Sequence, residues 1–155
     1  MAEKKNLFSF VPQVELSMVR EIKTASNSYK SSEEVARSEF AASLLKSDRE
    51  KFICMHLNIK NQIISFEVVS TVSLTSSLVH PREVYKGAIL SNAASVIFMH
   101  NHPSGDPEPS NDDMEITKRL EKAGNILGID VLDHIIVASG GFYSFRQHNL
   151  IGGRK

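Results

Sequence analysis

The segment spanning residues 95–113, SVIFMHNHPSGDPEPSNDD, constrains the fold of this chain more than any other segment. Residues 95–99 form a continuous apolar run of the kind found in a strand that is covered on both faces. Alternate residues of an extended chain point to the same side, so we expect the imidazoles of His100 and His102 to share one side. The fold should therefore contain a buried strand that carries two histidines at its carboxyl end.

The residues after the second histidine predict a turn and then a helix. Pro103 cannot donate a ladder hydrogen bond and Gly105 permits a tight turn, so the chain should leave the strand at this point. Ser110 and Asp113 have the spacing of a capping box, in which a first-turn carboxylate is favoured by unpaired amides and by the helix dipole. This arrangement predicts a carboxylate that returns toward the two histidines.

Two imidazoles, one carboxylate and an open fourth position form the ligand set of a hydrolytic zinc site. Zinc held in this way lowers the pKa of its bound water to about 7 and polarises a carbonyl oxygen. We therefore predict Zn²⁺ as the cofactor, with His100, His102 and Asp113 as its ligands. Such a site also needs a general base, which should be a glutamate that touches the water and not the metal.

The remaining patterns predict strands that alternate with helices. Apolar or alternating runs indicate strands at 14–22, 51–58, 62–72, 95–99, 131–137 and 142–145. Helical spacing predicts three helices, whose apolar faces are Val35, Ala36, Phe40, Ala41, Leu44 and Leu45; Val84, Ala88 and Ile89; and Ile116, Leu120, Ala123 and Leu127. Ser31, Pro81 and Ser110 begin these helices. The order predicts an α/β or α+β fold, a mixed β-sheet with helices packed on it.

Composition bounds the domain organisation and the setting. A chain of 155 residues is one ordinary domain, which we place at 31–150 behind an N-terminal extension at 1–30. Eighteen basic residues balance eighteen acidic ones, so the overall charge does not favour nucleic acid or an anionic membrane. The sequence has one cysteine and no apolar run that could span a bilayer, and a secretory signal is not recognised. We expect a cytoplasmic protein without membrane contact.

The motif itself resembles a known family. The likeness is carried by the run His100-x-His102-Pro103-x-Gly105-x(4)-Ser110-x-x-Asp113, which resembles the JAMM motif of the JAB1/MPN metalloprotease domain. HNHPSGDPEPS, together with DHIIV at 133–137, resembles the bacterial RadC branch. The likeness extends from about Glu50 to Phe145. It implies a mixed sheet between helices, related to the cytidine deaminase fold.

The resemblance also implies an activity and the roles of residues. The expected reaction is hydrolysis of a peptide or isopeptide bond in a peptide or protein substrate. His100, His102 and Asp113 match the zinc ligands, and Ser110 matches a hydroxyl that helps to stabilise the oxyanion. Glu50 matches the catalytic glutamate, and Glu83, in the run HPREV, is the alternative general base.

The sequence leaves other functions open. The alternative is a non-proteolytic RadC-like accessory protein of DNA repair or mobile-element biology that binds protein or DNA. RadC proteins commonly carry a helix-hairpin-helix module, which the residues ahead of Glu50 do not contain, and this puts DNA binding in doubt. A deaminase should show a Pro-Cys-x-x-Cys motif, which one cysteine cannot supply. Exposed strand edges offer a route to a homodimer or to an extended peptide.

Asp133 and His134 allow two interpretations. Because ligating imidazoles need a partner for their second ring nitrogen, this pair could lie beside the metal ligands. The alternative interpretation, which the residue types favour, is a buried hydrogen-bonded pair without a role at the metal.

Overall fold

The computed structural model describes residues 28–71 and 79–152. Its elements follow one another as α1 (Ser32–Ala36), α2 (Glu39–Leu44), β1 (Phe52–Leu57), β2 (Ile63–Ser70), α3 (Pro81–Leu90), β3 (Ser95–Asn101), α4 (Asn111–Leu127), β4 (Asp130–Ala138) and β5 (Gly141–Ser144). The strand predicted at 14–22 lies outside the described residues. The boundary between an extension at 1–30 and a domain at 31–150 stays a prediction.

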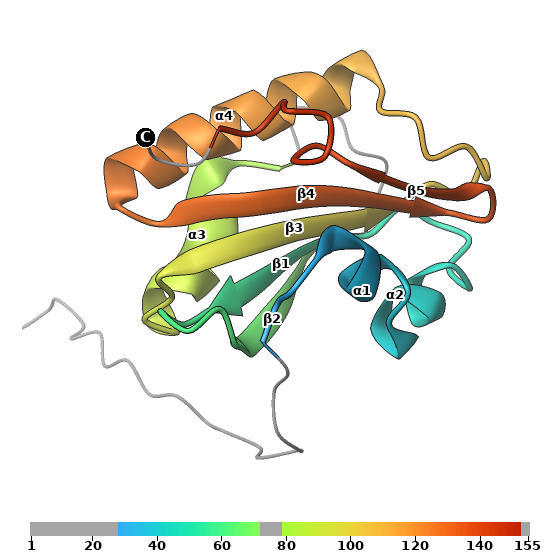
Figure 1. The fold of residues 1–155 in the computed structure, drawn as a ribbon. Coiled ribbons are helices and arrows are strands. Elements are labelled where there is room, and N and C mark those ends of the chain that lie inside the picture. The colour runs from blue at the N-terminus through green and yellow to red at the C-terminus, as the bar shows by residue number, and fades with distance from the viewer. Residues whose placement is uncertain (1–27, 72–78, 153–155) are drawn as a thin grey trace, which may run out of the picture.

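A five-stranded sheet in the order β2-β1-β3-β4-β5 forms the centre of the described fold. β3 and β4 pair in parallel, and the other neighbouring strands pair antiparallel. The crossover that a parallel pair requires is made by α4. α3 and α4 cover one face of the sheet, whereas α1 and α2 lie against the other (Figure 1). The predicted mixed sheet with helices on both sides is confirmed.

Successive residues of β1 and β3 alternate between two apolar cores. The core under α3 and α4 contains Phe52, Cys54, Val96 and Phe98. The core under α1 and α2 contains Ile53, Met55, Ile97 and Met99. Every residue of β3 is buried, as predicted for a strand covered on both faces. Continued alternation directs His100 toward α4 and Asn101 toward the opposite side.

The first predicted helix is wrong as a single element, because the structure divides it into α1 and α2. Ser38 leaves the helical conformation at ψ 157° and caps α2. Its hydroxyl donates to the Val35 carbonyl at 2.7 Å and accepts from the Ala41 amide at 3.2 Å. In this way a serine hydroxyl competes with the backbone for hydrogen bonds. Val35 and Ala41 are buried as expected, but Leu45 is 45% exposed.

Besides Leu45, two further residues assigned to buried helix faces are exposed, namely Ile89 at 52% and Leu127 at 47%. Tyr85 occupies the centre of the contact between α3 and α4, where its hydroxyl donates to the Leu120 carbonyl at 2.7 Å. A Cβ atom at Gly124 would lie 2.5 Å from the Tyr85 hydroxyl oxygen. The two helices approach each other closely at Gly124, and Ile89 and Leu127 lie outside this contact.

The predicted turns are present, and one of them is displaced by one residue. β1 and β2 are joined at 58–62, where Asn61 has φ 56° and the Asn58 amide donates to the Gln62 carbonyl at 3.0 Å. Gly128 ends α4 in the left-handed conformation at φ 74°. The turn between β4 and β5 is formed by Ser139 and Gly140, one position earlier than the predicted Gly140-Gly141, and Gly141 begins β5. Among the described residues, no helix has the length and apolar character needed to cross a membrane.

Candidate metal centre

β3 and α4 bring together the side chains of His100, His102 and Asp113. The Nε2 atoms of the two histidines lie 2.9 Å apart. His100 Nε2 is 3.3 Å from Asp113 Oδ1, and His102 Nε2 is 3.4 Å from Asp113 Oδ2. Three potential ligand atoms, one from each residue, all lie within 4.8 Å of one another, and this group could hold a metal ion. His100 and Asp113 are buried, whereas His102 is partly exposed.

The turn after β3 holds His102 beside His100. The His102 amide donates to the Val137 carbonyl at 2.9 Å, so the pairing with β4 continues past the end of β3. Gly105 then adopts φ 89°, and its amide donates back to the His102 carbonyl at 3.1 Å. The Gly105 carbonyl accepts from Gly140 at 2.9 Å, which docks this turn on the turn between β4 and β5. A side chain at Gly105 would also meet Ser139.

A complete capping box fixes Asp113 at the start of α4. Asp113 Oδ2 accepts from the Ser110 amide and from the Ser110 hydroxyl, both at 2.7 Å. The Asp113 amide donates to the Ser110 hydroxyl oxygen at 3.1 Å. The predicted cap is therefore present, and it orients the carboxylate toward the two imidazoles.

The charges of the three side chains suit a cation. Burial opposes ionisation of Asp113, but its interactions with the imidazoles of His100 and His102 and the hydrogen bond from Ser110 outweigh it and hold the pKa of this carboxyl far below its usual range. Burial lowers the pKa of His100, whereas the hydrogen bond with Asp113 raises the pKa of His102. The site thus combines an ionised carboxylate with a neutral, buried imidazole.

The hydrogen bond made by Nδ1 of His102 decides which of the two ring nitrogens carries the hydrogen. His102 Nδ1 lies 2.8 Å from the Asp106 carbonyl oxygen, which can only accept. Nδ1 must therefore donate, and the Nε2 atom of a neutral His102 presents a lone pair toward His100 and Asp113. Neutral imidazole and carboxylate are the donors that zinc takes in catalytic sites, so the residues present fit this metal.

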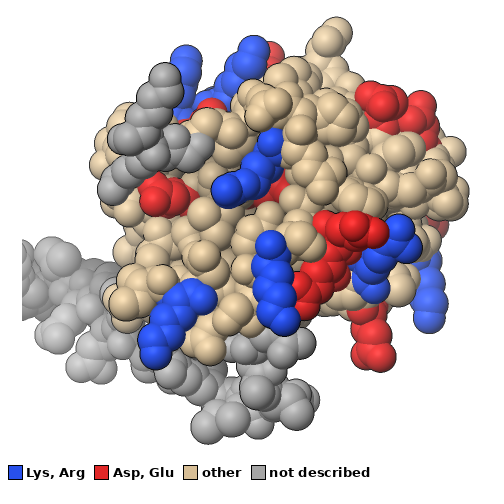
Figure 2. Space-filling model, viewed as in Figure 1, with Lys and Arg blue, Asp and Glu red and all other residues tan. Residues whose placement is uncertain are grey.

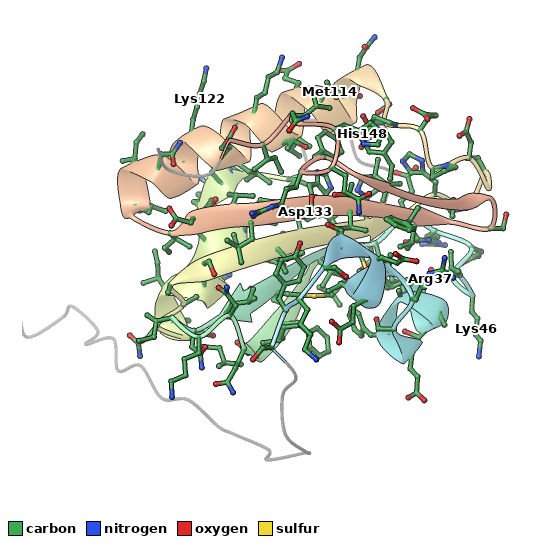
Figure 3. The ribbon with its side chains drawn as sticks, in the orientation of Figure 1. Arg37, Lys46, Met114, Lys122, Asp133 and His148 are labelled. Atoms are coloured by element: carbon green, nitrogen blue, oxygen red, sulfur yellow. The ribbon has the colours of Figure 1, made fainter. Side chains whose placement is uncertain are left out.

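The Asp133–His134 pair is divided between two places. His134 Nε2 lies 2.8 Å from His100 Nδ1, and His134 Nδ1 lies 2.6 Å from the Thr117 hydroxyl. Asp133 instead accepts hydrogen bonds from Ser32 and Ser144 and links α1 to the sheet, on the side of β4 shown in Figure 3. Neither interpretation of the sequence separated the two residues in this way.

Thr117 was not recognised from the sequence. Its position gives a usable signal, because residues four apart on a helix share one face and Asp113 lies four positions earlier. The Thr117 hydroxyl donates to the Asp113 carbonyl at 2.6 Å.

Glu50 and Glu83 lie in different surroundings. Glu50 lies two residues before the start of β1, is half-buried, and its negative charge acts to raise the pKa values of both His100 and His102. Glu83 lies on the first turn of α3, half exposed, where its carboxylate is 3.1 Å from Lys86 Nζ and 3.5 Å from Arg82 Nε. The charge of Glu50 is thus felt at the histidines, whereas Glu83 takes part in a surface ion-pair cluster.

Asn101 holds both neighbours of Glu50. Its side-chain amide donates to the Arg49 carbonyl at 3.0 Å, and its Oδ1 accepts from the Lys51 amide at 2.9 Å. Asn101 is 1% exposed and belongs to β3. The strand that carries His100 therefore also restrains the segment that carries Glu50.

The surface charge is mixed on the face that Figure 2 shows, where Lys and Arg side chains are interspersed with Asp and Glu. This agrees with the balance of eighteen basic and eighteen acidic residues in the sequence. A protein that neutralises many phosphates presents a concentrated basic surface. The viewed part of the described structure has no such surface.

Comparisons with known proteins give one matching family model and several related proteins. A family model described as the RadC-like JAB domain matches residues 29–150. A UPF0758 protein of Symbiobacterium thermophilum is 57% identical over 104 residues, which cover 67% of this chain and 44% of that protein. UPF0758 proteins of Methanosarcina acetivorans and Moorella thermoacetica are 52% and 54% identical, over 66% and 67% of this chain and 45% of each relative. The chain thus aligns with less than half the length of these relatives, whose names state no activity.

Proposed function

Because the chain belongs to the RadC-like JAB domain family, we propose that it is a zinc-dependent metallopeptidase of the JAMM type, which hydrolyses peptide or isopeptide bonds. The observation that carries this proposal is the convergence of two imidazole nitrogens and one ionised carboxylate on a common point. The cytoplasmic location and the homodimer stay predictions beside it.

His100, His102 and Asp113 are the proposed ligands. β3 supplies one imidazole, the turn after it supplies the second, and the capped start of α4 supplies the carboxylate. When bound, zinc supplies a Lewis acid that activates water and polarises the carbonyl of the scissile amide. The protein contributes a rigid ligand set, since each of the three side chains has a further hydrogen bond that orients it.

Glu50 is the proposed proton shuttle. Its carboxylate accepts a proton from the attacking water as the C–O bond forms, and donates it to the amide nitrogen as the C–N bond breaks. Its electrostatic influence on both histidines and its restraint through Asn101 support this role. Glu83 is the less suitable base because Lys86 and Arg82 already pair with its carboxylate.

Ser110 is proposed to assist the developing oxyanion through its hydroxyl. In the structure this hydroxyl donates to Asp113 Oδ2. Rotation of the hydroxyl about the Cβ–Oγ bond would redirect the hydrogen to a substrate oxygen. Asp113 would keep its orientation meanwhile, because the Ser110 amide also donates to Oδ2 at 2.7 Å.

The test compares wild-type protein with Glu50→Gln and the matched Glu83→Gln. Each protein is loaded with zinc, its zinc content is measured by mass spectrometry, and cleavage of a peptide library and of isopeptide-linked peptides is followed. We expect one zinc per protein molecule in all three, cleavage by wild type and Glu83→Gln, and a loss of about 10² to 10⁴-fold in Glu50→Gln.

Three outcomes contradict parts of the proposal. If Glu83→Gln lost peptide cleavage to the extent expected for Glu50→Gln, and Glu50→Gln lost none, the shuttle role would belong to Glu83. Stoichiometric zinc without cleavage of any substrate would favour the non-proteolytic accessory protein. Salt-sensitive affinity for DNA in that protein would identify nucleic acid as its partner.

A further inference from the structure

An unbroken series of hydrogen bonds links two of the proposed ligand residues behind the site. His100 Nδ1 lies 2.8 Å from His134 Nε2, and His134 Nδ1 lies 2.6 Å from the Thr117 hydroxyl oxygen. That hydroxyl lies 2.6 Å from the Asp113 carbonyl oxygen. His134 and Thr117 are 0% and 1% exposed. The series therefore joins β3, β4 and α4 in a region that water does not reach.

The hydrogen bond between Thr117 and the Asp113 carbonyl decides which atom donates in each bond of the series. The Asp113 carbonyl oxygen can only accept, so the single hydroxyl hydrogen of Thr117 must point toward it. The Thr117 oxygen is then left as an acceptor, and His134 Nδ1 must carry the hydrogen that it receives.

The same logic continues to the site. A neutral imidazole has one N–H, so His134 Nε2 is an acceptor once its Nδ1 is a donor. His100 Nδ1 must then donate to it, which leaves His100 Nε2 without hydrogen. This is the nitrogen that faces His102 and Asp113.

We propose that His134 and Thr117 are positioning residues that set the tautomer of His100, and thereby the affinity of the site for its metal ion. The proposal rests on the ligand role of His100 in the proposed function, but not on proteolysis. His102 achieves the same result with a main-chain carbonyl, whereas His100, buried at the end of β3, does so through a second imidazole.

The surroundings of His134 hold its ring in one orientation. The ring stacks on Phe145 at a centroid distance of 4.8 Å and an interplanar angle of 14°. Phe52 and Phe98 meet the ring edge to face at 5.4 and 6.0 Å. Because these aromatic side chains exclude water, no solvent molecule can replace His134 as the partner of His100. Loss of such a partner commonly weakens metal binding by about 10 to 100-fold.

The experiment uses the whole 155-residue chain at one fixed pH and measures two quantities. Zinc affinity is measured by competition with a chromophoric chelator. The tautomer of His100 is read from the ¹⁵N chemical shifts of its ring nitrogens in metal-free protein. We expect a protonated Nδ1 and an unprotonated Nε2 in wild type.

Two matched pairs of variants separate hydrogen bonding from packing. Thr117→Val replaces the hydroxyl by a methyl group of similar size, and Thr117→Ser keeps it. His134→Leu removes both ring nitrogens, and His134→Gln keeps an acceptor for His100. We expect zinc affinity to fall at least tenfold in His134→Leu and severalfold in Thr117→Val, with recovery in Thr117→Ser and His134→Gln.

Phe145→Leu is the control for packing, because Phe145 touches the His134 ring without a hydrogen bond. It should lower thermal stability and leave the His100 tautomer unchanged. If His134→Leu does not fold, the Thr117 pair decides the question. Hydrogen on His100 Nε2 in the metal-free wild type, or equal zinc affinity in Thr117→Val and wild type, would overturn the proposal. Absence of zinc binding in wild type would instead overturn the proposed function, since the tautomer is read without metal.

Discussion

The Nε2 atoms of His100 and His102 lie 2.9 Å apart, and each ring already uses its Nδ1 in another hydrogen bond. Lone pairs that face each other at this distance repel, and the carboxylate of Asp113 adds negative charge beside them. A cation at this point relieves the repulsion, whether it is a proton in the metal-free protein or a metal ion. The site is therefore arranged for a positive charge that the three side chains do not themselves provide.

Zinc should stabilise the folded protein through this group. At a free concentration 100 times the dissociation constant, the gain is about 2.7 kcal/mol, or roughly 5 to 10 °C in melting temperature. Differential scanning fluorimetry with and without a chelator measures this shift. Asp113→Asn should remove most of it, whereas His148→Gln, an imidazole outside the group, should retain it. An undiminished shift in Asp113→Asn would contradict the ligand assignment.

Ser110 should have separable effects on stability and on catalysis. Replacement of a capping serine by alanine costs about 1 kcal/mol, but replacement by glycine costs only a few tenths. Ser110→Ala should therefore be less stable in urea than Ser110→Gly. If the hydroxyl also serves the oxyanion, both variants should lose peptide cleavage equally, by about 10²-fold. Cleavage rates that instead follow the order of stability would assign Ser110 a capping role alone.

Asn101 should hold the backbone of the segment that carries Glu50 in place. Asn101→Ala leaves the Arg49 carbonyl and the Lys51 amide without their partner, at a cost of about 1 to 3 kcal/mol. We expect faster tryptic cleavage after Arg49 and Lys51, weaker peptide cleavage, and retained zinc.

The exposed turn after Lys60 supplies an internal control for this prediction, since trypsin should cut there at an unchanged rate. Asn101→Asp keeps the acceptor for Lys51 but loses the donor to Arg49, so it should be intermediate. If trypsin cut after Arg49 no faster in Asn101→Ala than in wild type, this segment would be held by other contacts.

His56 should make stability depend on pH. Burial lowers the pKa of His56 to about 4, and its Nδ1 lies 2.8 Å from the Ser65 hydroxyl. Between pH 6.5 and 4 the unfolded protein binds a proton here that the folded protein does not, so stability is present above this range and falls as the pH falls through it. The contribution is up to about 1.4 kcal/mol per pH unit.

Urea unfolding of chelator-treated protein at several pH values tests this dependence. His56→Gln should give a flatter profile than wild type over the same range, because the other buried histidines are common to both proteins. Parallel profiles for the two proteins would show that His56 keeps an ordinary pKa.

The family relationship and the mixed sheet could both be predicted from the sequence, because their signals are local or periodic. A continuous apolar run indicated the buried strand β3, and the spacing of Ser110 and Asp113 indicated a capping box. Predictions for segments with weaker sequence patterns were less accurate. Ser38 interrupts the first helix through its own side chain, and Ile89 lies outside the contact between α3 and α4. Such details depend on competing hydrogen bonds and on packing between helices.

By itself the sequence determined that His100, His102 and Asp113 should converge, since a strand, a turn and a helix start of these lengths leave few other paths. Only the tertiary structure decided the surroundings of these residues. It brought His134 of β4 behind His100, placed Thr117 beside it, and let Asn101 restrain the segment of Glu50. These contacts join strands and helices that are far apart in the sequence. The local spacing of residue types does not predict which distant side chains will come into contact.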